Sequence, residues 1–457
     1  MSPPAAQVLS WSGRLPAFLL LCLGVWLYAA DSLLVATTMP EAVREIGGLD
    51  FIDWTVSLYL LASIVASAAA PRLIRRMGLQ RALIGGAACY GIGCTVSALA
   101  PDIGVMLLAR LAQGVGGGLM LALSYVAIQH LFPAHLWTRL LAIHAGVWGA
   151  SSLCGPLIGG LFAQAQLWRG AFWAFAAQAA LLCLLAATRL HGLSEDQPTP
   201  AADRTGDSPW RPLLALSIAI LAISTAGVSA PALAVLLAVA GLVLLGLAGW
   251  LDGAAQARLM PCGALQPAHP IGAALLMVLC LSAGTTAFVT YGPVLLEALA
   301  ASSALIVGYV VAGESLAWTL GTLAVAKAGS ARLIIHCGVV LIVAGGCALG
   351  LAVPLAVMPA IILGVASQGV GFGMLWPHLS QRIVIAARPD ERDLAAACAS
   401  TVSRIGGAIG SAANGIVANG AGLAGGATAA HAYQAAVWVF GTSIPLLLIG
   451  YAAARRI

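Results

Sequence analysis

Four ionisable side chains interrupt long apolar stretches of this 457-residue sequence: Asp31, Arg110, Glu314 and Arg404. An ionised residue near the middle of a membrane helix costs about 2.5–3.5 kcal/mol on insertion scales, so each of them is a functional candidate. A carboxylate can bind and release a proton when burial and a neighbouring guanidinium tune its proton affinity, whereas an arginine keeps its charge. These residue types therefore predict a proton-coupling centre inside a membrane.

The elements that must position these side chains are membrane helices. Hydrophobic residues form 61% of the chain and charged residues only 8%, against about 25% charged residues in soluble domains, and the mean hydropathy is +0.98. Many apolar runs reach about 20 residues, the length of a transmembrane helix. The 53 glycines suit close packing between such helices. We therefore expect an all-α membrane protein.

Composition also excludes several kinds of site. The net charge of +5 comes from arginines scattered over short loops, which is not the clustered pattern of a nucleic-acid-binding protein. The ten cysteines lie mostly inside apolar runs and form no C-x-x-C pair. We therefore expect no metal site, no disulfide framework and no cofactor.

Apolar runs and breaker residues predict fourteen transmembrane spans. The segment 191–210 is polar and rich in Pro, Ser and Asp, which is typical of a flexible linker. We predict a six-helix half at 1–190, the linker, two inserted helices at 211–251, and a second six-helix half at 252–457. The predicted spans are 16–38, 53–74, 80–100, 104–131, 138–163, 170–190, 211–228, 231–251, 268–293, 304–327, 332–352, 355–386, 394–419 and 431–454.

The loops between these spans predict the orientation of the chain. Alternate loops on one side carry nearly all of the arginines and Lys327, whereas the other side carries only Arg44 and Arg169. By the positive-inside rule, the basic loops and both termini face the cytoplasm. The first span contains Asp31 and no small-residue cleavage site, so it is expected to be retained. We expect a multi-pass protein in contact with lipid in a cell membrane, such as the bacterial inner membrane.

The two halves contain an internal repeat. The run QGVGGG from Gln113 reappears as QGVGFG from Gln368, an offset of 255 residues. At the same offset, Gly155 matches Gly410 and Gly160 matches Gly415. Two six-helix halves related by a repeat form a known transporter architecture, whose binding site lies between the halves near mid-membrane.

Helix rise predicts the depth of the ionisable residues. With about 1.5 Å per residue, Asp31 and Arg110 both lie roughly 10 Å below the outer surface, and Glu314 and Arg404 lie near the middle of their spans. We therefore predict two acid–base pairs, Asp31 with Arg110 and Glu314 with Arg404. The alternatives are that the first pair is purely structural and that Glu314 is a packing residue.

Several motifs in order resemble one known family, the 14-helix drug:proton antiporters of the major facilitator superfamily (EmrB/QacA-like). The segment DSLLVATTMP at 31–40 is similar to its first-helix signature, and RLAQGVG at 110–116 to its fourth-helix motif. Residues 146–160, which end in GPLIGG, resemble its fifth-helix antiporter motif, and SRIGGAIG at 403–410 its penultimate helix. The resemblance covers nearly the whole chain, and the fifth-helix motif implies export.

The loop after the second span departs from the family pattern. Relatives usually read Gly-x-Leu-x-Asp-Arg-x-Gly-Arg-Arg, whereas this chain has Pro71 for the first glycine and Arg75 for the acid. The resemblance implies a conformational role for this loop. We assign such roles to Arg75, Arg76, Gly78 and Arg81, and also to Gly155 and Pro156, which kink the fifth span. Ordinary kinking without coupling is the alternative for that pair.

Other polar and aromatic residues within the spans are candidates for a substrate cavity. Packing or anchoring at the membrane interface is the alternative for the aromatic residues, and packing for the histidines. The candidates are Gln113, Tyr125, His144, Trp148, Tyr291, Trp318, Gln368, Trp376 and His378.

The predicted function is proton-coupled export of a small amphipathic or cationic compound by alternating access. The chain contains no G-x-x-x-x-G-K-[ST] motif, so an ion gradient is the expected energy source. No H-E-x-x-H, G-x-S-x-G or facing intramembrane Asp pair indicates an enzyme, and a channel would not need a two-half repeat. The alternative is a proton symporter, or an exporter of a specific metabolite such as a siderophore. We expect the transporter to work as a monomer.

Overall fold

The computed structural model of this chain describes residues 11–132, 134–190, 210–255, 258, 260–325, 330–388, 391–425 and 428–457. Residues 191–209 of the predicted linker and Lys327 lie outside these ranges, and Trp210 is the first residue of a helix. Within them the chain is built of helices joined by short connections. The long helices are α1 (Trp11–Ile46), α2 (Ile52–Leu99), α3 (Ile103–Leu131), α4 (Ala134–Gln164), α5 (Trp168–Arg189), α6 (Trp210–Ala226), α7 (Pro231–Ala254), α8 (Pro270–Ala300), α9 (Ala304–Val325), α10 (Ala331–Ala352), α11 (Met358–Ala386), α12 (Arg392–Gly420) and α13 (Ala429–Ala454).

The fourteen predicted spans all correspond to helical segments of the described chain. Two of them lie in α2, which consists of two helical segments separated by a kink with non-helical backbone at Gly78. The positive φ of 78° at that position favours glycine. Twelve helical segments are long and apolar enough to cross a membrane. The shorter α6 and the more polar α12 complete the fourteen.

Two helices are longer than predicted. We expected the first span to end at residue 38, but α1 continues through Pro40 to Ile46. The span expected to end at 293 continues through Pro293 to Ala300 in α8. Asp31 therefore lies fifteen residues before the end of its helix, about 22 Å along the axis.

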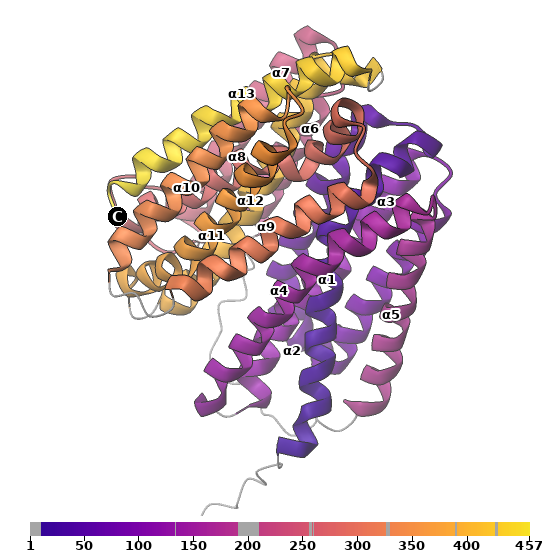
Figure 1. Ribbon diagram of the computed structural model, residues 1–457. Coiled ribbons are helices and arrows are strands. Elements are labelled where there is room, and N and C mark those ends of the chain that lie inside the picture. The colour runs from indigo at the N-terminus through magenta and orange to yellow at the C-terminus, as the bar shows by residue number, and fades with distance from the viewer. Residues whose placement is uncertain are drawn as a thin grey trace, which may run out of the picture.

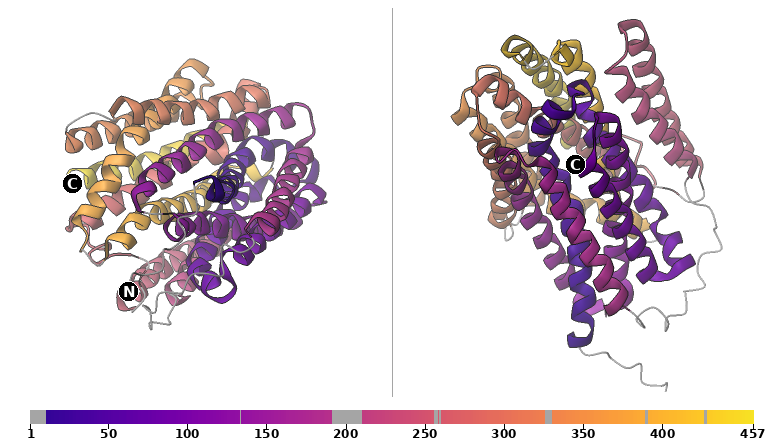
Figure 2. Two further views of the ribbon diagram at one scale, coloured as in Figure 1. Left: turned by 90° about the horizontal axis from the view of Figure 1, so that it is seen from below. Right: turned by 90° about the vertical axis from the view of Figure 1, so that its right-hand side faces the viewer.

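The helices form two groups that lie side by side (Figure 1). Helices α1–α5 contact one another on one side, and α8–α13 do so on the other. The main contacts between the groups join α4 to α9 and α12 to α2. The pair α6 and α7, rose-coloured in the right-hand view of Figure 2, lies at one edge, where α6 touches α12 and α2.

The internal repeat is visible in how glycines bring helices together. A side chain at Gly114 would overlap the backbone oxygen of Tyr59, and one at Gly369 would overlap that of Glu314. Tyr59 and Glu314 are themselves 255 residues apart. In the same way Gly155 approaches Ala30, while Gly410 approaches Ala283. The matched glycines therefore make matched close approaches in the two groups of helices.

The two groups are joined near one face of the molecule. We call it the closed face; it contains the helix ends Ile46, Ile52, Gln164, Ala300, Ala304 and Gly420. Arg44 pairs there with Glu297 at 2.6 Å, and Asn419 donates a hydrogen bond to the backbone oxygen of Asp50 at 2.6 Å. Deeper in the molecule, Ser57 bonds to the oxygen of Ala408 at 3.3 Å.

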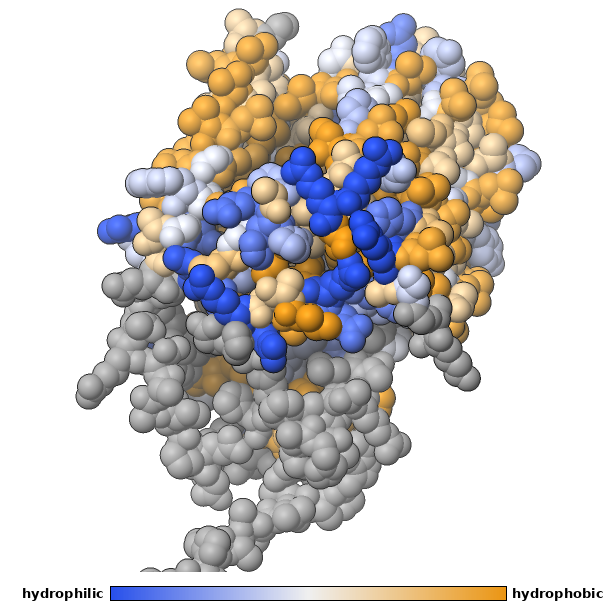
Figure 3. Space-filling view, turned by 90° about the vertical axis from the view of Figure 1, so that its left-hand side faces the viewer, coloured by the Kyte–Doolittle hydropathy of each residue, from blue (hydrophilic) through white to orange (hydrophobic). Residues whose placement is uncertain are grey.

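The opposite face contains the helix ends Arg189, Trp210, Ala331, Ala386, Arg392 and Ala454, and we call it the basic face. Arg382 donates to the oxygen of Ile457 there, and Arg456 to that of Pro267 at 3.2 Å. Figure 3 shows hydrophilic residues gathered in the middle of the side on which the C-terminus lies, with apolar surface on both flanks. Flanking apolar surface suits contact with lipid.

Candidate functional site

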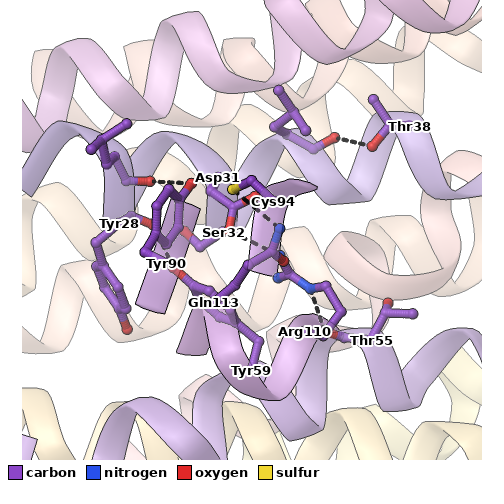
Figure 4. A network of polar contacts seen from close by, with 12 residues as sticks. Tyr28, Asp31, Ser32, Thr38, Thr55, Tyr59, Tyr90, Cys94, Arg110 and Gln113 are labelled. Carbon is purple, nitrogen blue, oxygen red and sulfur yellow. Dashed lines mark hydrogen bonds and ion pairs between the residues drawn. The ribbon is translucent and has the colours of Figure 1, made fainter. Parts of the chain in front are cut away.

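The first predicted acid–base pair is formed and completely buried. Arg110 of α3 donates to Asp31 of α1 at 2.9 Å, and the two side chains are 1% and 0% exposed (Figure 4). The same guanidinium donates to the backbone oxygen of Thr55 at 3.1 Å and to Oε1 of Gln113. It also lies over the Tyr59 ring, 4.2 Å from the centroid. Arg110 is thus held by three helices.

Asp31 has fewer hydrogen-bond partners than Arg110. Asp31 accepts through Oδ2, while its Oδ1 has no hydrogen-bond partner among the described residues. Removing a carboxylate from water costs several kcal/mol, and attraction to a single guanidinium offsets only part of this cost. Asp31 is therefore a buried acid that the protein satisfies through one of its two carboxyl oxygens.

Backbone geometry around α1 fixes this pair in place. A side chain at Gly117 would lie 2.9 Å from the Tyr28 ring, and one at Gly118 would overlap the oxygen of Ser63. Tyr59 donates to the oxygen of Tyr28 at 2.9 Å. The glycine-rich run after Arg110 lets α3 approach α1 and α2 closely enough for the ion pair to form.

The predicted antiporter motif of α4 lies between α1 and α9. A side chain at Gly155 would be 2.6 Å from the oxygen of Ala30, and one at Gly160 would be 2.8 Å from that of Ala304. The proline in this helix cannot donate to the carbonyl of residue 152, and its own oxygen accepts from Thr37 at 3.2 Å. The motif therefore packs α4 tightly against α1, one residue before Asp31, and against the second half.

The second predicted pair, between Glu314 and Arg404, is not formed. Arg404 instead donates to Oγ of Ser67 at 3.2 Å, across the boundary between α12 and α2. Among the described residues Glu314 forms no ion pair. Both residues were predicted near the middle of their spans, but they lie on α9 and α12, and these two helices are not in extensive contact. Depth along a helix did not reveal which neighbour each side chain faces.

Several predicted cavity residues form two aromatic groups. In the first half, Trp148 meets Tyr28 at a centroid distance of 5.8 Å, and Tyr125 meets His144 at 4.6 Å. In the second half, Trp318 lies 6.1 Å from Trp376 and stacks on Phe372 at 5.2 Å. The two halves come close near these aromatic groups: a side chain at Gly149 of α4 would lie 3.7 Å from Thr319 of α9.

The remaining predicted cavity residues are not all in these groups. Gln113 is fully buried and accepts a hydrogen bond from Arg110. Tyr291 lies near Asp53 towards the closed face, away from the aromatic groups. Gln368 is buried against Gly345 and Gly346, and His378 is half-buried on α11.

The predicted conformational residues near the basic face are only partly described. Gly78 breaks α2, and Arg76 and Arg81 on either side of it are exposed. The side chain of Arg75 lies outside the described part of the chain. A cavity of about 480 Å³ opens elsewhere on this face. It lies between the end of α7, the segment before α8 and the end of α11, and contains none of the predicted cavity residues.

Sequence reasoning missed two features of the site. Tyr59 was not singled out, although its ring supports Arg110 and its carbonyl meets Gly114. Asp53, at the first residue of a predicted span, was not singled out either, yet it is only 1% exposed. The FxxW pattern of residues 51–54 gave no sign that the acid points inward.

The proteins that this chain resembles in sequence and in structure are membrane transporters. Residues 21–411 match the family described as Major Facilitator Superfamily. A Mycobacterium tuberculosis protein named probable multidrug-efflux transporter is 33% identical over 442 residues, which cover 92% of each chain. Among solved structures, a peptide transporter superposes with a TM-score of 0.70 at 14% identity, covering 97% of this chain and 94% of the other. A D-xylose–proton symporter gives 0.66 at 17% identity, covering 95% and 97%.

Proposed function

Because the chain belongs to the major facilitator superfamily and is a multi-pass membrane transporter, not an enzyme, we propose that it exports small amphipathic or cationic compounds in exchange for protons. The single observation that carries this proposal is the buried Asp31–Arg110 pair, which lies beside the α4 motif. The name of the mycobacterial relative, multidrug-efflux transporter, supports export of drug-like compounds. Import of a metabolite with protons, or export of one specific metabolite, is the alternative.

The mechanism uses the two halves, residues 1–190 and 252–457, as the moving bodies, with 211–251 as an insertion at one edge. The closed face is extracellular and the basic face, with both termini, is cytoplasmic. Asp31 takes up a proton when its site opens to the outside and loses it when the site opens to the inside. Arg110 stays charged, lowers the cost of ionised Asp31 and provides no proton itself.

The orientation makes a direct prediction about accessibility. In a cysteine-free background, single cysteines at positions 50 and 420 of the closed face are expected to react with a membrane-impermeant maleimide applied to intact cells. Cysteines at positions 200 and 457 should react only after the membrane is opened. The reason is the charge asymmetry, since arginine-rich loops are retained in the cytoplasm. Labelling at position 200 from outside would overturn the fourteen-helix topology.

Glu314 is proposed to select for positively charged substrates. The structure gives this carboxylate no cationic partner among the described residues, unlike Asp31. An unpaired acid in a low-dielectric site attracts a lipophilic cation strongly. Trp318, four residues on along the same face of α9, stacks on Phe372 and offers its ring system to a flat cation.

The substrate prediction is tested in cells that lack their own drug pumps. Wild-type protein is expected to lower the accumulation of a monovalent cationic dye and of a neutral dye of similar size. Glu314→Gln should lose at least about tenfold of the activity towards the cation, an effect of roughly 1.4 kcal/mol, and keep that towards the neutral dye. Glu45→Gln, an exposed acid that pairs with Arg169 within the first half, is the matched control. Equal loss of both dyes would assign Glu314 to coupling or folding.

A further inference from the structure

A second acid, Asp53, lies buried where α2, α8 and α12 meet near the closed face. Its side chain is 1% exposed, and a side chain at Gly415 of α12 would lie 2.5 Å from its carboxyl group. Ser411 of α12 donates to the backbone oxygen of Asp53 at 3.2 Å and contacts Thr290 of α8 at 3.3 Å. The acid is therefore enclosed by the second half of the molecule.

This junction contains several polar atoms without partners. Within the described residues, neither carboxyl oxygen of Asp53 accepts a well-formed hydrogen bond, and the nearest donors are the backbone N–H groups of Asp53 itself and of Trp54. The Tyr291 hydroxyl on α8, which is within electrostatic reach of Asp53, also has no hydrogen-bond partner among the described residues. Buried polar atoms usually have partners, so the carboxyl group of Asp53 and the hydroxyl of Tyr291 form a polar junction that the protein itself satisfies poorly.

The charges around Asp53 do not compensate an ionised carboxylate. Asp50 of the short helix η1 (Leu49–Phe51) acts on it with the same sign, and Tyr291 is the titratable group that faces it from α8. None of the ion pairs in the described part of the chain includes Asp53, and Arg110 is engaged by Asp31. The nearest favourable contribution is the amino end of α2, where Asp53 lies in the first turn.

The magnitudes decide between the two protonation states. A helix N-terminus stabilises a carboxylate by typically about 0.3–1 kcal/mol. Burying an ionised carboxylate without a partner costs several kcal/mol. The neutral acid is therefore the favoured form while the closed face is closed. When α12 moves away from α2, water reaches the carboxyl group and the charged form is no longer penalised.

We propose that Asp53 is a proton-binding site of the closed face, which takes up a proton as that face closes. The inference builds on the proposed alternating movement of the two halves. The proton enters from the closed face and returns to it on opening, so it biases the movement without being carried across. Because the closed form holds this proton more tightly, closure is favoured at low pH and weakened as pH rises.

The test measures the distance between the two halves at the closed face. Spin labels at positions 165 and 430, in a cysteine-free background in nanodiscs, report the closed and open populations by pulsed electron resonance. For wild-type protein the ratio of closed to open forms is expected to fall by about tenfold or more between about pH 5.5 and about pH 8.5. Asp53→Asn and Asp53→Ser, which are uncharged at every pH, should stay mostly closed and lose this shift.

The control is Asp102→Asn, an exposed acid that caps α3 and does not act on Asp53, which should keep the wild-type pH response. A response in Asp53→Asn equal to that of the wild type would overturn the proposal. Closure that follows added Na⁺ at constant pH would also overturn it, because Asp53 would then bind a metal cation in place of a proton. The assay contains no substrate and no gradient, so its result is separate from that of the export assay. The pH response can be absent while pH-driven export succeeds, and it can be present while export fails.

Discussion

Replacing Arg110 with alanine is expected to destabilise the protein more than any other single change at the site. The substitution leaves Asp31 buried with no cation and removes the donor to Thr55 and Gln113. Breaking a buried ion pair by deleting one partner typically costs about 3–5 kcal/mol. Arg110→Ala should therefore give a lower yield of monodisperse protein and a lower unfolding temperature in detergent.

A matched arginine separates this effect from the loss of any intramembrane charge. Arg404 also lies inside a helix, but it is partly exposed and its partners are Ser67 and the oxygen of Ser400. Arg404→Ala should remain folded. The double variant Asp31→Asn with Arg110→Ala should recover much of the lost stability, because no unpaired charge remains. Equal stability of the two single variants would contradict the importance of the buried pair.

Replacing Asp31 with asparagine is expected to abolish uphill export while the protein still folds and binds. Asparagine keeps the shape of the side chain and can still accept a hydrogen bond from Arg110. It cannot bind and release a proton, so an imposed pH gradient can no longer drive export. Exchange of labelled for unlabelled substrate across vesicles needs no net proton movement and should continue.

An exposed acid provides the control for the asparagine variant. Asp102 caps α3 by accepting from the backbone nitrogen of Val105 at 3.0 Å, and asparagine caps a helix equally well. Asp102→Asn should therefore export like the wild type. Normal uphill export by Asp31→Asn would remove Asp31 from the coupling mechanism and leave its pair with Arg110 as a structural element.

The sequence was sufficient to predict the fold and the first ion pair for physical reasons. Apolar runs of membrane length leave helices as the main option, and charges stranded in them must find partners. The matching glycines at 114 and 369 identified the repeat because close helix approach requires a residue without a side chain at that point.

Other features depend on which face each helix turns to its neighbours. Glu314 and Arg404 were paired by depth, but Arg404 meets Ser67 of the other half. The hydrogen bond that Gln113 accepts from Arg110, one helical turn away, was not predicted either. Asp53 was not singled out, because nothing in its own helix reveals that Gly415 of α12 covers it.

The most direct test of proton-coupled export follows both species at once in proteoliposomes. Purified protein is reconstituted with a pH-sensitive dye in the lumen, the membrane potential is clamped with K⁺ and valinomycin, and a cationic substrate is added outside. Exchange of substrate for protons predicts that the lumen becomes more alkaline as substrate enters, and that Asp31→Asn shows no change. Acidification of the lumen would identify a symporter, and substrate entry without any pH change would contradict coupling to protons.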